Sequence, residues 1–197
     1  MSDAPNRRLV LDDTAVRRAV RRLAHEIVER AGPLNTIALV GIRTRGLPLA
    51  RRLAAVVREV EGLEVPVGAL DIALYRDDAF TGGSKVAVGQ THLPFDVADK
   101  TVVLVDDVLF TGRTVRAALD ALMDFGRPRR IQLAVLVDRG HRELPIQPDY
   151  VGQVVATQAG QSIKVSLTEI DAGPGGEDAV HLLDTPERAN GEARKAP

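Results

Sequence analysis

The segment from Val102 to Thr114 constrains the fold of this 197-residue chain more than any other part of its sequence. Its first residues, Val102 to Val105, are apolar and mostly β-branched, which is typical of a buried strand. Two adjacent carboxylates, Asp106 and Asp107, follow where this strand is expected to end. A turn of small and polar residues then leads into a helical pattern from Val115 to Phe125. A strand that runs directly into a helix is the unit from which parallel α/β sheets are built.

Helical and strand patterns alternate along the rest of the chain. Apolar residues recur every three or four positions from Asp12 to Arg30, with Asp12 or Asp13 as the expected N-cap. The other expected elements are a helix over 47–60 and strands over 36–42, 65–74, 131–137, 150–156 and 163–167. This order predicts an α/β fold with a central, mostly parallel sheet flanked by helices. Ligands of such sheets bind beyond the carboxyl ends of the strands.

Length and composition favour a single domain. A chain of 197 residues, 45% of them hydrophobic, can bury one substantial core, which we expect over residues 1–171. Residues 172–197 are rich in Gly, Pro, Glu and Ala, and we expect them to be disordered or to fray. The absence of cysteine excludes disulfides and thiolate zinc sites. Neither a signal peptide nor an apolar run of spanning length occurs, so the prediction is a cytoplasmic protein without a membrane partner.

The acidic pair and the turn after it can bind different parts of a phosphorylated sugar. Free N–H groups of the turn and of the helix start can hold a phosphate dianion. Asp106 and Asp107 can accept hydrogen bonds from vicinal ribose hydroxyls, directly or through a hydrated Mg²⁺ ion. The alternative is an ordinary strand–helix junction with an aspartate cap, although buried strands seldom end in two carboxylates that bind nothing. The spacing of an ATP-binding P-loop is absent, which argues against a kinase or an ATPase.

Three further loops follow strands at the same expected edge of the sheet. Arg43 to Gly46 opens a helix, so its N–H groups can face an anion; a plain turn with solvated arginines is the alternative. Tyr75 to Pro94 is long and polar, which predicts a mobile lid that excludes water, with a surface charge cluster as the alternative. Val137 to Pro145 is a compact, charged loop that suits recognition of a base, and His141 within it is either functional or simply solvated.

Residues Val102 to Thr114 resemble the loop that binds phosphoribosyl diphosphate (PRPP) in type I phosphoribosyltransferases. By that resemblance, Thr44 to Gly46 matches the loop that holds pyrophosphate, and Asp106 and Asp107 hold Mg²⁺, directly or through water. The catalytic residues that it implies are Asp106, Asp107, Arg45 and Arg76. The PRPP and nucleotide ligands that it implies are Thr44, Arg45, Gly46, Val102, Val103, Leu104, Val105, Asp106, Asp107, Val108, Leu109, Phe110, Thr111, Gly112, Arg113 and Thr114.

The resemblance narrows to the PyrR family over about residues 9–171. The segments that carry it are Glu26, 71–78, 102–114, 126–128 and 131–145. PyrR proteins bind pyr operon mRNA as attenuators and convert uracil and PRPP to UMP and pyrophosphate. The resemblance implies PRPP, uracil, UMP or UTP and an mRNA stem-loop as partners, and a homodimer or a larger homo-oligomer. It also implies a small hood that recognises the base, with Val137, Asp138 and Arg139 as uracil ligands.

Two positions separate this chain from hypoxanthine–guanine phosphoribosyltransferases, which it also resembles around residues 136–150. Those enzymes have an aspartate at the position of Phe110, where it handles a proton on the purine N7. They have a lysine at the position of Asp138, where it meets the exocyclic oxygen of the purine. Phe110 cannot handle a proton and Asp138 reverses the polarity, so a pyrimidine base is expected. The N3–H group of uracil would be met by Asp138 or by a nearby carbonyl.

Basic residues are concentrated near the start of the chain, with 12 arginines against five acids from Arg7 to Glu59. Several of them fall three or four residues apart in the first expected helix and form one polar stripe. The RNA-binding residues expected from this stripe and from similarity to PyrR proteins are Arg18, Arg22, His25, Arg30 and Arg142. The alternative is a solvated basic helix face. The net charge of −1 gives no global field for nucleic acid, and no DNA partner is expected.

Three positions depart from the PyrR pattern in the RNA-binding region. Arg21 replaces a threonine found in many relatives, and Gln147 and Gln153 replace basic residues. If those two sites meet phosphates, RNA binding should be weaker and less dependent on salt. Three interpretations therefore stay open: a bifunctional regulator and enzyme, a uracil phosphoribosyltransferase without an RNA function, and a UMP-sensing RNA regulator with negligible turnover.

Overall fold

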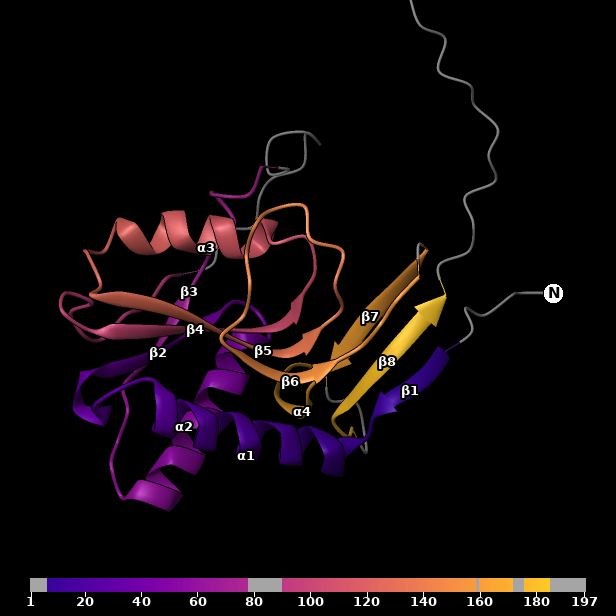
Figure 1. Ribbon diagram of the computed structural model, residues 1–197, viewed down its shortest axis with the longest axis horizontal. Coiled ribbons are helices and arrows are strands. Elements are labelled where there is room, and N and C mark those ends of the chain that lie inside the picture. The colour runs from indigo at the N-terminus through magenta and orange to yellow at the C-terminus, as the bar shows by residue number, and fades with distance from the viewer. Residues whose placement is uncertain (1–6, 78–89, 159, 172–175, 185–197) are drawn as a thin grey trace, which may run out of the picture.

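A parallel sheet of five strands forms the centre of the molecule (Figure 1). The computed structural model describes residues 7–77, 90–158, 160–171 and 176–184. The strands of this sheet are, in spatial order, β3 (Val67–Leu70), β2 (Ile37–Ile42), β4 (Thr101–Leu109), β5 (Arg130–Asp138) and β6 (Tyr150–Val154). Every neighbouring pair is parallel. The predicted α/β class and the mostly parallel sheet are confirmed.

Helices cover both faces of the sheet. In Figure 1, α1 (Asp13–Arg30) and α2 (Gly46–Glu61) lie below it and α3 (Arg113–Met123) lies above it. Asp12 caps α1 as predicted, because its carboxylate accepts a hydrogen bond of 2.7 Å from the N–H of Ala15. A short 3₁₀ turn, Leu34–Thr36, precedes β2. No helix in the described ranges is long and apolar enough to cross a membrane.

Two apolar layers hold the helices to the sheet. One layer packs the apolar faces of α1 and α2 on β2, β4 and β5, and Leu23 and Ile27 of α1 are almost fully buried in it. The other packs α3, with its fully buried Ala117 and Ala118, on the opposite face. The strands are thus buried on both sides, which explains why they are continuous apolar runs rather than alternating patterns.

The strand β4 is longer than the sequence predicts. The prediction that it ends before the acidic pair is wrong, because Asp106 and Asp107 lie within the strand, which continues to Leu109. Pairing with β5 extends to Leu109 opposite Asp138, whereas pairing with β2 stops at Val105. The two carboxylates therefore lie where β2 ends, beside a free edge of β4. They still occupy the carboxyl edge of the sheet, as expected.

Other boundaries differ by a few residues. The strand expected over 65–74 is limited to Val67–Leu70, where its pairing with β2 ends, and turn residues follow. The helix expected over 115–125 begins earlier, directly after Gly112, and ends at Met123. The strand expected over 163–167 is β7 (Gln161–Ser166). Such shifts are usual, because the ends of elements depend on tertiary pairing that local patterns do not contain.

A second, antiparallel sheet corrects the expectation for the end of the chain. It has the order β1–β8–β7, with β1 (Arg7–Leu11) and β8 (Ala179–Asp184) as strands that the sequence patterns did not predict. The boundary at residue 171 is therefore wrong for residues 179–184, which form the central strand of this sheet. Val180 and Leu182 of β8 are buried, and a six-residue, mostly apolar segment within a Gly-, Pro- and Glu-rich stretch was too weak a signal to identify it. Residues 172–175 and 185–197 lie outside the described ranges.

Candidate active site

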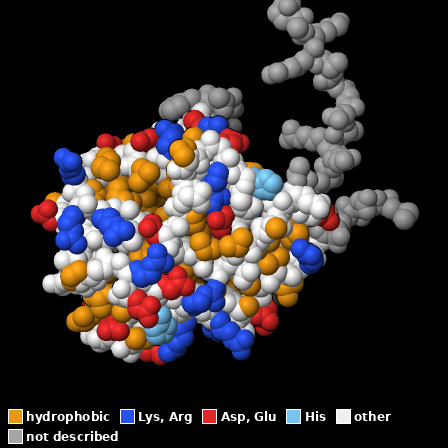
Figure 2. Space-filling view, viewed as in Figure 1, with side chains coloured by type: hydrophobic (Ala, Val, Ile, Leu, Met, Phe, Trp, Pro, Cys, Tyr) orange, Lys and Arg blue, Asp and Glu red, His pale blue; other side chains and the backbone are white. Residues whose placement is uncertain are grey.

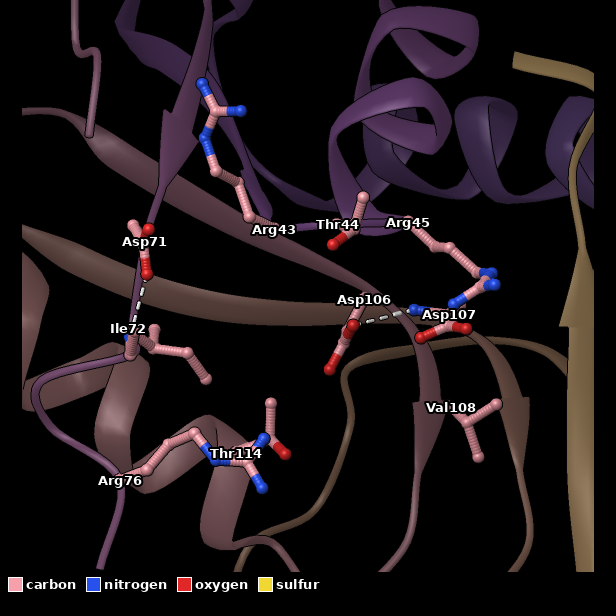
Figure 3. Close-up of a pocket in the computed structure, with 11 residues that line it drawn as sticks. Arg43, Thr44, Arg45, Asp71, Ile72, Arg76, Asp106, Asp107, Val108 and Thr114 are labelled. Atoms are coloured by element: carbon pink, nitrogen blue, oxygen red, sulfur yellow. Dashed lines mark hydrogen bonds between the residues drawn. The ribbon is translucent and has the colours of Figure 1, made fainter. Parts of the chain in front are cut away.

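A cavity of about 510 Å³ opens at the carboxyl edge of the main sheet (Figure 3). The loop after β2, the turn after β3, the end of β4 and the start of α3 surround it. Its lining residues are Arg43, Thr44, Arg45, Asp71, Ile72, Ala73, Arg76, Asp106, Asp107, Val108 and Thr114. The cavity thus brings together the four residues expected from the sequence to be catalytic, Arg45, Arg76, Asp106 and Asp107.

The acidic pair is unusually protected from water. Asp106 is 7% exposed, and one of its carboxylate oxygens accepts a hydrogen bond of 2.9 Å from the N–H of Asp107. Burial raises the pKa of Asp106 well above the ordinary carboxyl value, and the charge of Asp107 raises it further. Burial also raises the pKa of Asp107, although the hydrogen bond with Asp106 and the charge of Arg45 oppose this. A cation or a hydrogen-bond donor would stabilise the ionised form of both carboxylates and offset the cost of their burial.

This donor set fits a hydrated Mg²⁺ ion. Magnesium binds through one or two carboxylates and keeps waters or substrate phosphates for its other positions. Asp106 and Asp107 offer such a pair of oxygen ligands beside an open cavity. Within the described ranges, no group of three or more histidine, aspartate or glutamate side chains is arranged to hold a metal. The site therefore suits a cation completed by water and by ligand oxygens, not one enclosed by the protein.

The loop after β2 is pressed against β4 by a close backbone approach. A Cβ atom at Gly46 would lie 2.1 Å from the carbonyl oxygen of Val105, so only glycine fits at the start of α2. This contact places Thr44 and Arg45 beside the acidic pair, as Figure 3 shows. The Arg45 side chain extends toward Asp107 and also binds Asp171, with donor–acceptor distances of 3.1 Å and 2.6 Å. The loop residues Arg43, Thr44 and Arg45, which precede α2, line the cavity and can bind an anion there.

A smaller cavity of about 280 Å³ adjoins the first one at the turn after β4 and shares Arg76, Val108 and Thr114 with it. Arg76 and residues 108–115 line it, together with Asp77. Gly112 adopts a left-handed backbone with φ of 94°, which lets the chain turn sharply into α3. The first N–H groups of α3 have no partner within the helix, so the turn can hold a phosphate dianion. Two of the residues that both cavities share, Val108 and Thr114, are among those expected from the sequence to bind PRPP.

The base-recognition residues lie beyond this turn. The Arg139 guanidinium lies 3.9 Å from the centre of the Phe110 ring and donates to the carbonyl of Gln161 at 2.6 Å. The Asp138 carboxylate accepts bonds from the N–H of Gly140 at 2.9 Å and from Arg142 at 2.6 Å. Arg139 and Phe110 therefore form a polar–aromatic surface at the mouth of the site, whereas both Asp138 oxygens are used within the loop.

Some of the residues assigned to ligands do not reach the cavities. Val102 to Leu104 and Val137 are fully buried in the sheet and line neither cavity, so they support the site from behind. The structure adds Arg43 and Asp71 to the lining, which the sequence did not assign. Asp71 is the first polar residue after an apolar strand, a signal that could have identified it. Arg43 is likewise the first polar residue after an apolar strand, β2, and could have been identified in the same way.

The predicted lid lies only partly within the described ranges, since residues 78–89 are outside them. The beginning of the segment is held on α3, where Arg116 donates to the carbonyl of Tyr75 at 2.9 Å and the Tyr75 hydroxyl binds Asp124. Asp77 forms an ion pair with Arg113 of the turn. Arg113 also donates to Glu143 of the base loop at 2.7 Å. Arg113 thus connects three loops around the mouth of the site.

The expected RNA-binding residues do not all lie together. Arg18, Arg22, His25 and Arg30 are exposed on α1, and Figure 2 shows basic side chains interspersed with acidic ones and a histidine over this helix. Arg22 donates to the carbonyl of Gly152, and Arg30 donates to the carbonyl of Asp149 at 3.2 Å. Arg142 lies instead in the β5–β6 loop on the α3 side, only 15% exposed and bound to Asp138. The structure therefore separates it from the stripe on α1.

Comparison with known proteins identifies close sequence relatives. Residues 9–169 match the phosphoribosyl transferase domain family. The chain is 57% identical over 176 residues to the bifunctional protein PyrR of Roseiflexus sp. (strain RS-1), covering 89% of this chain and 94% of that protein. It is 59% identical over 169 residues to the bifunctional protein PyrR of Thermus thermophilus, covering 86% of this chain and 91% of that protein.

Solved structures share the fold at low sequence identity. A hypoxanthine-guanine phosphoribosyltransferase of Bacillus anthracis matches with a TM-score of 0.63 at 15% identity, over 90% of this chain and 96% of that chain. A hypoxanthine phosphoribosyltransferase of Staphylococcus aureus matches with a TM-score of 0.61 at 16% identity, over 79% and 80% of the two chains. These two likenesses confirm the type I phosphoribosyltransferase fold.

Proposed function

Since the chain belongs to the PyrR family of phosphoribosyltransferase-domain proteins, we propose that it forms UMP from uracil and PRPP and also binds pyr operon mRNA. The observation that carries the enzymatic part is the pair of joined cavities at the carboxyl edge of the sheet. One contains a buried acidic pair and an arginine loop, and the other contains the N-terminus of a helix. These are the groups that ribose hydroxyls, a diphosphate and a phosphate require.

The ligand is divided among three loops. The 5′-phosphate of PRPP binds the turn Thr111 to Thr114, and the diphosphate binds Thr44, Arg45 and Gly46. Asp106 and Asp107 accept hydrogen bonds from the ribose hydroxyls between these two ends. This assignment is supported by the adjacency of the two cavities, which share Arg76, Val108 and Thr114 in their linings. Arg76 lines both cavities and carries its charge toward the diphosphate.

The reaction is displacement of pyrophosphate from the anomeric carbon by the N1 atom of uracil, which releases its proton as the C–N bond forms. Positive charge develops on the ribose ring as the C–O bond breaks, and the carboxylates of Asp106 and Asp107 stabilise it electrostatically. Arg45 and Arg76 stabilise the charge that develops on the leaving pyrophosphate. Asp106 and Asp107 would hold a Mg²⁺ ion, directly or through water, and its charge would further neutralise the diphosphate. Positioning of uracil against the anomeric carbon supplies the rest of the rate enhancement, and no general base is assigned.

Uracil is the base that the site favours. Phe110 offers an aromatic surface without a group that can handle a proton on a purine N7. Both oxygens of the Asp138 carboxylate already accept hydrogen bonds, which favours a backbone carbonyl as the partner of the uracil N3–H group. Arg139 stacks on the Phe110 ring, which assigns it to the uracil end of the site as a support for that ring.

The enzymatic proposal is tested by incubating the protein with uracil, PRPP and Mg²⁺ and following UMP by chromatography. We expect UMP and pyrophosphate in equal amounts. Asp107→Asn should lower kcat/KM for PRPP by about 100-fold, because it removes a charge opposite the developing cation. Asp120→Asn is the matched control, since Asp120 lies on α3 and pairs with Arg116 outside both cavities. Absence of UMP formation by the wild type would overturn the enzymatic part.

The RNA proposal rests on the exposed stripe of α1. The protein would bind the stem-loop in the cytoplasm as a homodimer or a larger assembly, with UMP or UTP favouring the RNA-competent state. Ion pairs between Arg17 and Asp13 and between Arg21 and Glu59 moderate the charge of this face, which supports contact with a shaped RNA rather than with any polyanion. Arg142 is mostly buried in its pair with Asp138, so we restrict the proposed RNA-binding surface to α1.

Filter binding to a cognate pyr leader, with and without UMP, tests the RNA proposal. Arg22→Ala should weaken binding about 10-fold, as expected for loss of a charged contact. Arg127→Ala, which removes an exposed arginine from the α3–β5 turn, is the control and should bind like the wild type. Unchanged affinity of the Arg22→Ala protein would exclude this face. If the wild-type protein forms UMP but does not bind the RNA, the alternative of a uracil phosphoribosyltransferase without an RNA function is favoured.

A further inference from the structure

Arg45 is held in place by a residue far along the chain. Its Nε and Nη2 atoms donate to the two carboxylate oxygens of Asp171 at 3.1 Å and 2.6 Å, a bidentate pair. Both side chains are mostly covered, at 31% and 24% exposed. Arg45 lines the larger cavity and Asp171 does not. The carboxylate therefore acts on the site through the arginine.

Asp171 is itself fixed by its neighbours. It ends the single-turn helix α4 (Thr168–Asp171) between β7 and β8. Its Oδ2 atom also accepts from the N–H of Leu167 at 2.9 Å, and its own N–H donates to the Leu167 carbonyl at 2.7 Å. Arg52 of α2 anchors the same segment through Glu169 and Asp178, and Asp178 is only 3% exposed. The carboxylate thus has a defined position against α2.

The alternative partner of Arg45 is within the site. Asp107 acts electrostatically on the Arg45 guanidinium, which extends toward it in Figure 3. An arginine released from Asp171 would be drawn to Asp107 and would neutralise a carboxylate needed for the ribose. Held by Asp171, Arg45 uses Nε and Nη2 in that pair, and Nη1 donates to no oxygen among the described residues. Nη1 can then donate to an anion in the cavity.

We propose that Asp171 is the positioning residue for Arg45, holding the guanidinium where it binds the diphosphate of PRPP and keeping it from Asp107. The inference deepens the proposed function and rests on PRPP binding at this cavity. The segment between β7 and β8, which belongs to the small sheet, thereby contributes to phosphate binding in the main sheet.

The first test is steady-state kinetics of Asp171→Asn. The amide keeps the shape of the side chain and loses its charge, so KM for PRPP should rise about 10-fold, while KM for uracil stays within about twofold. Glu169→Gln is the matched control: it breaks the neighbouring pair with Arg52 on the same short helix, outside the cavity. It should leave KM for PRPP within about twofold. Asp171→Glu, which keeps the charge but moves the carboxylate, should also raise KM for PRPP.

A double-mutant cycle separates positioning from general support. In an Arg45→Ala background, Asp171→Asn should add nothing to KM for PRPP, because the residue on which it acts is gone. Additive effects, or equal effects of Glu169→Gln and Asp171→Asn, would overturn the inference. Calorimetric binding of PRPP to the wild type distinguishes the two failures. If the wild type does not bind PRPP, the proposed function fails; if it does and Asp171→Asn binds equally well, only the positioning role fails.

Discussion

Asp106 combines deep burial with a neighbouring carboxylate, and both raise its pKa. Its native state therefore holds a proton more tightly than the unfolded chain does. The free energy of unfolding consequently falls as the pH rises from the ordinary carboxyl pKa of 3.8 toward the raised native value. Above this range the buried Asp106 therefore lowers the stability of the ligand-free protein, and a bound cation or sugar hydroxyls would offset this cost.

Replacement of Asp106 by asparagine should accordingly stabilise the ligand-free protein while removing its function. We expect Tm at pH 7 to rise by about 2–4 °C, the shift that roughly 1 kcal/mol produces in a chain of this size. The further rise in Tm that PRPP and Mg²⁺ give the wild type should disappear. Scanning calorimetry measures both. A lower Tm for Asp106→Asn without ligand would mean that the native carboxylate is already stabilised by protein groups.

Arg139 is the residue that most directly joins base recognition to Phe110. Its stacking and its bond to the Gln161 carbonyl require a planar guanidinium, which lysine cannot replace. Arg139→Lys should raise KM for uracil about 10-fold with KM for PRPP unchanged. Initial rates at varied uracil and saturating PRPP measure this, with Arg127→Lys as the exposed control. An equal rise in KM for uracil and KM for PRPP would contradict a role confined to the base and would indicate that Arg139 contacts the phosphates of PRPP.

At the scale of elements, the site depends on the contact between α2 and β4. Gly46→Ala would place a methyl group against the Val105 carbonyl and push the two elements apart. We expect a loss of about 1–3 kcal/mol in the free energy of unfolding and a raised KM for PRPP. Denaturant unfolding and steady-state kinetics test the two parts.

The other end of α2 supplies the control for that contact. Gly62→Ala strains a left-handed C-cap with φ of 68° and open space around it, so it should cost about 1–2 kcal/mol. KM for PRPP should not change in this variant. If Gly62→Ala raised KM as much as Gly46→Ala, lower stability alone would explain the effect on PRPP.

The sequence predicts these elements well where local signals are strong. The Asp12 cap and the regular apolar spacing define α1, and the apolar runs define β2 and β4. The extension of β4 through Asp107 was not predictable, since it depends on pairing with β5. Register between strands is a tertiary property, and a polar residue inside a strand gives no local sign of it.

At the scale of the whole molecule, the end of the chain is part of the fold. Removal of residues 172–197 would delete β8, the strand between β1 and β7, and the Asp178 partner of Arg52. We expect a protein that is insoluble or whose Tm is markedly lower, whereas removal of 185–197, which keeps β8 and Asp178, should lower Tm much less. Expression of both truncations and thermal unfolding decide this. Equal stability of the two would show that β8 contributes little.

Much of the site follows from sequence because its ligands are adjacent in the chain. Asp106, Asp107 and the turn to Thr114 form one continuous segment, and Thr44 to Gly46 form another. The pair of Arg45 and Asp171 joins residues 126 positions apart, and no local pattern connects them. The ion pair of Arg142 with Asp138 was also not predictable, because an arginine in a charged loop is equally compatible with an exposed position.

The two adjoining cavities are proposed to bind PRPP and to select a pyrimidine base. The most direct test is kcat/KM for uracil, hypoxanthine and guanine, each measured with the wild-type protein at saturating PRPP and Mg²⁺. We predict that kcat/KM for uracil exceeds both purine values by at least about 100-fold, because Phe110 itself has no group that can handle a proton on the purine N7. Turnover of hypoxanthine or guanine at or above the rate of uracil would contradict the claim.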